Sequence, residues 1–139
     1  VLTGPVEVFG LDGNRLVKVD FVGNWFEAER HHENYWRWTG GPSDLIIMNT
    51  NSEVVPARLS FVLNGISKRT VTLSHGERTL WEGEVSSRNS EKVELDSLEL
   101  IPGITRLSFR SDRAPSGADN DIRLLDLSVK NLRLELREP

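Results

Sequence analysis

Three aromatic rings and a guanidinium occupy four consecutive residues, Tyr35-Trp36-Arg37-Trp38. In an extended strand, Trp36 and Trp38 point to one face and Tyr35 and Arg37 to the other. Since a large ring buries roughly 150–250 Å² in a core, we expect Trp38 to be a core residue, with Trp36 either buried or exposed. Tyr35 and Arg37 then face solvent, where the ring stacks on a sugar and the guanidinium binds vicinal hydroxyls. An ordinary cross-strand pair is the alternative.

A fourth ring, Trp81, lies in the separate segment "ERTLWEGEV". Alternation places it on one face with Thr79, Gly83 and Val85. The pattern is equally typical of a core residue and of an exposed platform on an edge strand, so Trp81 is kept as a candidate ligand-binding residue.

Histidines and carboxylates precede the aromatic cluster. Glu27, Glu29, His31 and Glu33 alternate, and in an extended chain they share one side. Imidazole and carboxylate together suit a divalent metal, whereas a solvated polar edge strand is the alternative. His31 and His32 are therefore further candidate ligand-binding residues.

The longest polar loop, residues 110–123, is rich in oxygen ligands. Asp112, Asp119 and Asp121 are side chains of the type that Ca²⁺ binds. Their spacing does not match the EF-hand loop, and an Asx-rich turn whose acids are neutralised by neighbouring arginines is the alternative. These three residues are a candidate site for a structural calcium, and we expect no other cofactor.

Strands with period-two alternation must position these side chains. Alternation is typical of antiparallel sheets with one buried face. The alternating segments are residues 15–21, 57–65, 69–75, 91–100, 105–112 and 122–136. The hydrophobic phase shifts near Asp96-Ser97, which predicts a bulge or bend there, and it changes again at Lys130-Asn131.

Turn signals separate these segments at intervals of 8 to 12 residues. Gly40-Gly41-Pro42 predicts a turn after the aromatic cluster, and Asn64-Gly65 predicts a hairpin. The pattern indicates an all-β fold: a two-sheet antiparallel β-sandwich, most simply a jelly roll, of nine or ten strands. An immunoglobulin-like arrangement is the alternative. We expect one domain over residues 1–139, with 1–14 as an extra strand or a linker remnant.

Composition narrows the function. The chain has 17 basic and 21 acidic residues, a net charge of −4 and no cysteine. Without a basic stripe we expect no nucleic-acid partner. No nucleophile elbow, phosphate loop or zinc-protease motif is present, so we expect no enzyme, although a pair of catalytic carboxylates stays open. Because the chain does not begin with Met and has no long apolar run, we expect an excised domain or a mature product.

The segment from residue 102 to 136 resembles the end of many jelly-roll carbohydrate-binding modules: a Pro-Gly turn, "TRLSF", an Asp/Asn loop, then "IRLLDLSVKNLRL". With residues 24–65 it is similar to accessory β-sandwich domains of bacterial membrane proteins of envelope glycan synthesis, of the glycosyltransferase or phosphoglycerol-transferase type. The matching positions are Trp25, Glu29 (or Glu27), Trp36, Arg37, Trp38 and Thr39. The resemblance implies a non-catalytic extracytoplasmic module, periplasmic or at the cell surface, that binds a glycan or polysaccharide.

Three hypotheses follow. A carbohydrate-binding accessory module of a larger membrane-associated envelope protein predicts at least two exposed rings on one face or rim. A structural or protein-interaction domain predicts that all four tryptophans are buried. A small metal-dependent enzyme predicts that His31 and His32 converge with two carboxylates.

Overall fold

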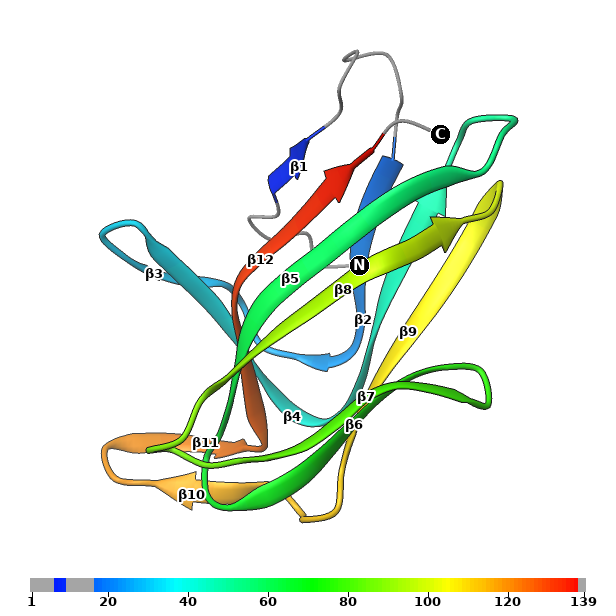
Figure 1. Ribbon diagram of the computed structural model, residues 1–139. Helices are drawn as coiled ribbons and strands as arrows, with labels where there is room; N and C mark the ends of the chain where they lie inside the picture. The colour runs from blue at the N-terminus through cyan, green and yellow to red at the C-terminus, as the bar shows by residue number, and fades with distance from the viewer. Residues whose placement is uncertain (1–6, 10–16, 138–139) are drawn as a thin grey trace.

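The computed structural model describes residues 7–9 and 17–137, which contain twelve strands and no helix (Figure 1). The strands are β1 (Glu7–Phe9), β2 (Val17–Trp25), β3 (Glu29–His31), β4 (Asn34–Asn49), β5 (Val55–Gly65), β6 (Arg69–His75), β7 (Arg78–Val85), β8 (Glu91–Leu100), β9 (Gly103–Ser111), β10 (Ser116–Ala118), β11 (Asp121–Leu125) and β12 (Leu127–Leu136). There are more strands than the nine or ten predicted. Strand β10 forms within the segment expected to be a polar loop, and the alternating segment 122–136 is divided at Asp126 into β11 and β12.

The strands form two layers. Sheet A has the order β2, C-terminal half of β4, β9, β6, β7, and sheet B the order β3, N-terminal half of β4, β12, β5, β8. Strand β1 pairs with β12 in parallel, β10 and β11 form a separate hairpin, and the remaining pairs are antiparallel. The predicted all-β sandwich of two largely antiparallel sheets is confirmed.

Strand β4 belongs to both layers. Residues 36–38 pair with β12 in sheet B, and residues 43–49 pair with β9 in sheet A. The turn predicted at Gly40-Gly41-Pro42 is therefore wrong, because the chain bends there without ending the strand. Gly41 has φ of 142°, a conformation that glycine adopts without a steric cost. Side chains keep one alternation across the bend, and every odd-numbered residue from 35 to 49 is buried.

The core lies between the sheets and contains a chain of edge-to-face aromatic contacts. Phe21 and Trp25 of β2 have ring centroids 5.1 Å apart, and Trp25 is 5.7 Å from Phe109 of β9. Phe109 contacts Phe61 of β5 at 5.6 Å, which joins sheet A to sheet B. Both Phe61 and Phe109 are essentially inaccessible to solvent. Contacts of this geometry add to the stabilisation from buried area.

The bulge predicted near Asp96-Ser97 is confirmed, and a second one lies where the hydrophobic phase changes at Lys130-Asn131. Leu95 of β8 pairs with Leu59, whereas Leu98 pairs with Ala57, so three residues of β8 span two of β5. Strand β12 has a similar irregularity, and Asn131 there has φ of 53°. Each extra residue resets the alternation, so that leucines on both sides of it point inward.

The hairpin predicted at Asn64-Gly65 is wrong. Strand β5 pairs with β12 and β8, whereas β6 pairs with β7 and β9. The connection after Gly65 crosses from sheet B to sheet A. The backbone N–H of Ile66 donates to the carbonyl of Asp126 at 2.9 Å, which directs the chain away from a hairpin.

The N-terminal segment contributes one described strand to the fold. Of residues 1–14, the structure describes strand β1 at Glu7–Phe9, and the others lie outside the described residues. Within the described part of the chain, no helical segment is long and apolar enough to cross a bilayer.

The contact between the sheets at Phe109 generates the first prediction. Replacement of Phe109 by Ala should lower the free energy of unfolding by about 3–5 kcal/mol, because it leaves a cavity where three rings meet. Urea denaturation measures the loss. Ile104→Ala on the same strand is the control, since Ile104 is 56% exposed, and it should cost well under about 1 kcal/mol. Equal losses in the two variants would contradict the assigned core.

Candidate functional site

Tyr35 and Arg37 point into the molecule, so the prediction that they face solvent is wrong. Tyr35 is 8% exposed, and its hydroxyl donates to the carbonyl of Leu132 at 3.0 Å. Arg37 is 5% exposed, and its guanidinium lies 4.4 Å from the ring centroid of Phe21. Their direction follows from the uninterrupted alternation of β4, in which odd-numbered residues are buried.

The buried guanidinium of Arg37 has a structural role. Its Nη1 donates to the carbonyl of Phe26 at 2.9 Å, while its Nε has no hydrogen-bond partner among the described residues. Burial lowers the pKa of Arg37, and Glu27 acts in the opposite direction. Arg37 therefore connects β4 to the segment after β2 and is not available to bind a sugar.

Trp36 and Trp38 lie on the outer face of sheet B, where both are half-buried. The prediction that Trp38 is a core residue is wrong, because the odd-numbered neighbours on β4 point into the core and Trp38 points to the other face. In the register of the sheet, Trp36 lies opposite Lys130 and Trp38 lies opposite Ser128. Directly opposed residues share one face of an antiparallel pair. The two indole rings therefore have polar neighbours on β12.

These side chains line a groove of about 420 Å³, here called the tryptophan groove. Its lining residues are Trp36, Trp38, Asn64, Gly65, Ile66, Ser87, Ser128 and Lys130. The strands β4, β12 and β5 provide its floor, and the connections after β5 and β7 provide its end. Apolar ring surface, hydroxyl and amide groups, and one ammonium group thus occur together. Concave sites that combine apolar walls with a few polar groups are typical ligand-binding sites.

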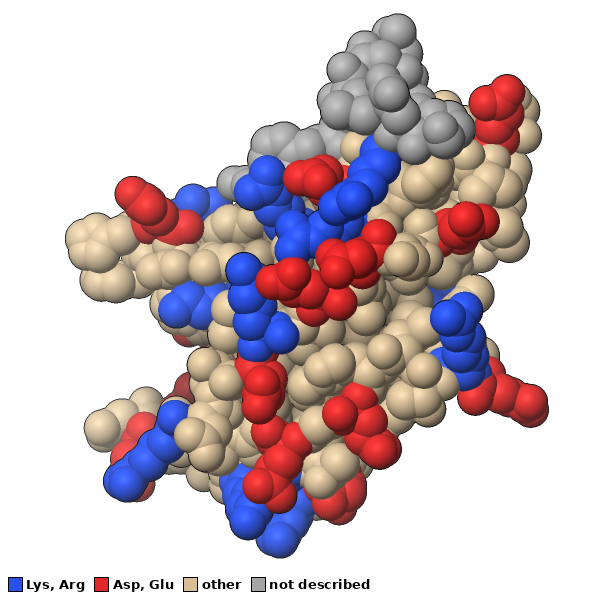
Figure 2. Space-filling model, viewed as in Figure 1, with Lys and Arg blue, Asp and Glu red and all other residues tan. Residues whose placement is uncertain are grey.

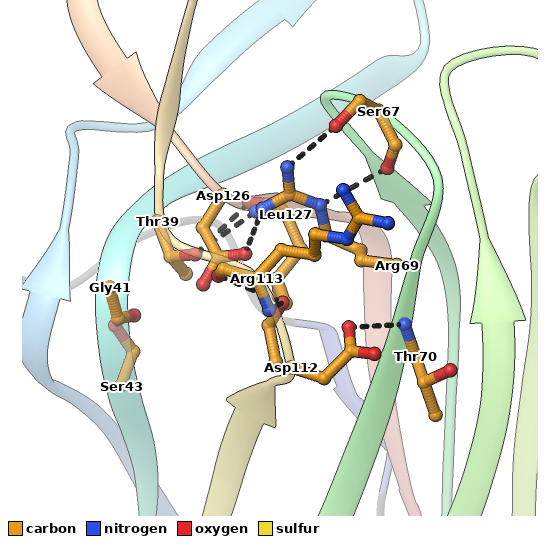
Figure 3. A network of polar contacts seen from close by, with 11 residues as sticks. Thr39, Gly41, Ser43, Ser67, Arg69, Thr70, Asp112, Arg113, Asp126 and Leu127 are labelled. Carbon is orange, nitrogen blue, oxygen red and sulfur yellow. Dashed lines mark hydrogen bonds and ion pairs between the residues drawn. The ribbon is translucent and has the colours of Figure 1, made fainter.

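A buried ion pair holds the end of the groove (Figure 3). The Arg69 Nη1 lies 2.5 Å from Oδ1 of Asp126, and both residues are at most 3% exposed. Arg69 also donates to the carbonyl and the hydroxyl of Ser67. The N–H of Asp126 donates to the carbonyl of Thr39 at 2.8 Å. The pair therefore fixes the β5–β6 connection, which includes Ile66 of the groove, against β4 and β12.

The hairpin β10–β11 is tied to β3 by Arg123. The guanidinium donates to both oxygens of Asp121 and contacts Oε2 of Glu29 at 3.3 Å, while it lies 5.1 Å from the Phe26 ring. The hydrogen bonds from Arg123 lower the pKa of Asp121 to about 2. The hydrogen bond with Asp121 in turn raises the pKa of Arg123. Asp121 is thus occupied as the partner of an arginine.

The structure does not assemble the predicted calcium ligands. Asp112 accepts the N–H of Thr70 at 2.8 Å, and Asp121 binds Arg123. In residues 7–9 and 17–137, no three His, Asp or Glu side chains come together as a metal site, Asp119 included. His31 and His32 likewise form no such metal-binding group with the carboxylates in these residues. The two imidazoles contact each other, with centroids 4.2 Å apart, at the exposed tip between β3 and β4.

Trp81 packs against the edge of the core. It is half-buried and lies opposite the buried Leu73. Trp81 therefore packs partly against the core on the edge strand β7, and it does not line the tryptophan groove.

A second hollow, of about 380 Å³, lies farther along the outer face of sheet B. It is lined by Glu33, Tyr35, Ser60, Phe61, Val62, Lys92, Asn131 and Arg133. Its charges are mixed, and Figure 2 shows acidic and basic groups side by side over β5 and β8. Arg58 binds both Glu94 and Asp96 there, and Lys92 lies 3.3 Å from Glu94.

The outer face of sheet A is also internally paired. Asp44 accepts hydrogen bonds from Arg106 at 2.5 Å and from Arg110 at 3.0 Å. Burial alone would raise the pKa of Asp44, but hydrogen bonds from these arginines and Ser108 outweigh it and the pKa is lowered.

Several groove residues were missed by the sequence analysis: Trp38 as a lining residue, Asn64, Ser87, Ser128 and Lys130. The local signal is ambiguous, because the run Leu45-Ile46-Ile47-Met48 has apolar side chains on both faces and does not show which phase continues back through the glycines. The partners on β5 and β12 depend on sheet pairing, which no local pattern shows.

No protein-family model and no curated protein matches the chain. Two solved structures are similar in fold. One is TmCBM61 in complex with beta-1,4-galactotriose, with a TM-score of 0.40, 14% identity and 89% of each chain covered. The other is a family 6 carbohydrate-binding module studied by binding sub-site dissection, with a TM-score of 0.41 and 10% identity over 96% of this chain and 100% of that chain. At these values the likeness carries no argument about the ligand or the role of this chain.

The buried ion pair generates a stability prediction. Asp126→Ala should lower the free energy of unfolding by about 3–5 kcal/mol, because Arg69 is left buried without its carboxylate. Glu84→Ala is the control: it breaks the exposed Lys68–Glu84 pair, whose atoms are 3.7 Å apart, and should cost less than about 1 kcal/mol. Denaturant unfolding compares the two. If Asp126→Ala cost no more than Glu84→Ala, the assigned role of the pair would be wrong.

The Asp121–Arg123 contact generates a pH prediction. A carboxyl resonance titration of Asp121 should have its midpoint near pH 2, below the ordinary value of 3.8. Because the pKa is lowered in the folded state, the contact stabilises the protein above about pH 4, and this contribution is lost as the pH falls toward 2. Arg123→Met removes the cause and should move the midpoint up toward 3.8. A wild-type midpoint already near 3.8 would contradict the contact.

Proposed function

We propose that the chain is a non-catalytic carbohydrate-binding module whose ligand lies in the tryptophan groove. The observation that carries the proposal is that Trp36 and Trp38, two residues apart on β4, share one outer face and line a groove of about 420 Å³. Two residues of a strand span about 6.6–6.8 Å, so the indoles provide adjacent apolar surfaces for a chain of sugar rings.

The polar lining supplies the second requirement of a sugar site. A pyranose has apolar C–H faces and hydroxyl groups at its edges, so it needs ring surface and hydrogen-bond groups together. Ser128 lies between Trp38 of β4 and Asn64 of β5 in one row across the sheet. The hydroxyl and the amide both donate and accept hydrogen bonds. This row matches the chemistry of a hydroxyl-rich ligand.

The alternatives have less support. A purely structural domain predicts four buried tryptophans, yet only Trp25 is buried, while Trp36, Trp38 and Trp81 are half-buried. A metal-dependent enzyme needs His31 and His32 beside carboxylates, and the described residues do not bring such a group together. The extracytoplasmic location and the link to a larger envelope protein stay predictions from the sequence resemblance.

Truncation of the groove rings tests the proposal. Trp36→Ala and Trp38→Ala should each weaken binding to a retained glycan by about tenfold or more, because each removes a large apolar contact. A glycan array identifies the ligand, and affinity electrophoresis compares the variants. Trp81→Ala is the matched control, with thermal melts to confirm folding, and should leave the affinity unchanged. Loss of binding in Trp81→Ala alone, or no glycan retained by the wild type, would contradict the proposal.

A further inference from the structure

We infer that the tryptophan groove selects an anionic glycan, and that Lys130 is the residue that recognises the negative group. The inference rests on the proposed function and narrows its ligand to sugars that carry a carboxylate, sulfate or phosphate near the ring stacked on Trp36.

The first support is the charge of the lining. The eight residues that line the groove include one cation, Lys130, and no carboxylate. The whole chain has a net charge of −4. A groove with only positive charge on a protein with an acidic excess is a local feature that favours an anionic ligand.

The second support is that Lys130 makes no ion pair with any residue that the structure describes. Two other lysines have acidic neighbours: Lys68 lies 3.7 Å from Glu84, and Lys92 lies 3.3 Å from Glu94. The carboxylate nearest in register, Glu29, lies opposite Trp36 on β3 and is already bound to Arg123. The ammonium group of Lys130 is thus left available for a ligand.

The third support is how the backbone positions this lysine. Lys130 is the last residue before the bulge of β12 and points outward by alternation with the buried Val129, and the next residue, Asn131, has a left-handed conformation with φ of 53°. Asn131 is held in place: its Oδ1 accepts the N–H of Tyr35 at 3.1 Å, and its Nδ2 donates to Asn34 at 3.0 Å. The bulge turns Leu132 into the core and leaves Lys130 on the outer face beside Trp36.

Geometry then specifies where the negative group lies. Lys130 sits between Trp36 of β4 and Val62 of β5 in one row of the sheet. Neighbouring strands are about 4.8 Å apart, so a ring stacked on Trp36 brings a substituent at its edge within reach of the four-carbon side chain. The ammonium group is a point charge that donates hydrogen bonds to a carboxylate, a sulfate or a phosphate alike.

Two pairs of matched ligands test the inference. Oligogalacturonate is compared with its methyl ester, and dextran sulfate with dextran, so that each pair differs in charge and shares its sugar. Affinity electrophoresis at about 20 mM and about 500 mM NaCl measures retention. We expect the wild type to bind at least one acidic ligand roughly fivefold more tightly than its neutral partner at low salt, and the preference to decline at high salt. The pair that shows the preference distinguishes a carboxylate from a sulfate.

Variants assign the preference to Lys130. Lys130→Met should remove the preference, so that the acidic and the neutral ligand of a pair are retained equally, whereas Lys18→Met, the same charge change on the exposed outer face of sheet A, should keep it. Equal binding of acidic and neutral ligands by the wild type, or equal effects of the two variants, overturns the inference. If Trp36→Ala still abolishes retention of neutral glycans, the proposed function stands without it. If no neutral or acidic glycan is retained, the proposed function itself fails.

Discussion

Strand β4 passes through both sheets without interruption, and the two faces of the molecule depend on this. One alternation runs from Tyr35 to Asn49, so the residues that face the core in sheet A and in sheet B are linked by a single phase. The buried leucine and isoleucine in the second half of the strand fix that phase, since moving them outward would forfeit much of the core. Trp36 and Trp38 are consequently held on the outer face, although larger rings are usually the more favourable ones to bury.

A buried arginine is a consequence of the same constraint. Arg37 occupies an inward position, where its charge is shielded by the Phe21 ring and by one backbone carbonyl. Such burial is costly compared with an apolar residue of the same size. The arginine in return joins β4 to the segment that leads into β3, and β3 flanks the tryptophans. The free-energy cost of burying Arg37 thus follows from the same alternation that holds Trp36 and Trp38 on the outer face.

The second anchor is the pair of Arg69 and Asp126. It connects the crossover between the sheets to the start of β12, and so to the strand that carries Ser128 and Lys130. Elsewhere on the surface, acids and bases mostly neutralise one another, as at Asp44 with Arg106 and at Arg58 with Glu94. The tryptophan groove differs in that its one charged residue, Lys130, makes no ion pair with any residue that the structure describes.

The sequence predicted the sheet content, the two-layer architecture and the bulge near Asp96-Ser97, because period-two alternation and its phase slips are local and strong. It also singled out the aromatic cluster. It assigned the wrong face to that cluster, because Gly40-Gly41-Pro42 resembles a turn and only long-range pairing with β9 and β12 shows that the strand continues. It misread Asn64-Gly65 likewise, since the choice between a hairpin and a crossover depends on Asp126, about sixty residues away. Ser128 and Lys130 come to lie beside the two indoles through the register between β4 and β12. That register is visible only in the folded structure, because the pairing of residues across a sheet leaves no mark in the local sequence.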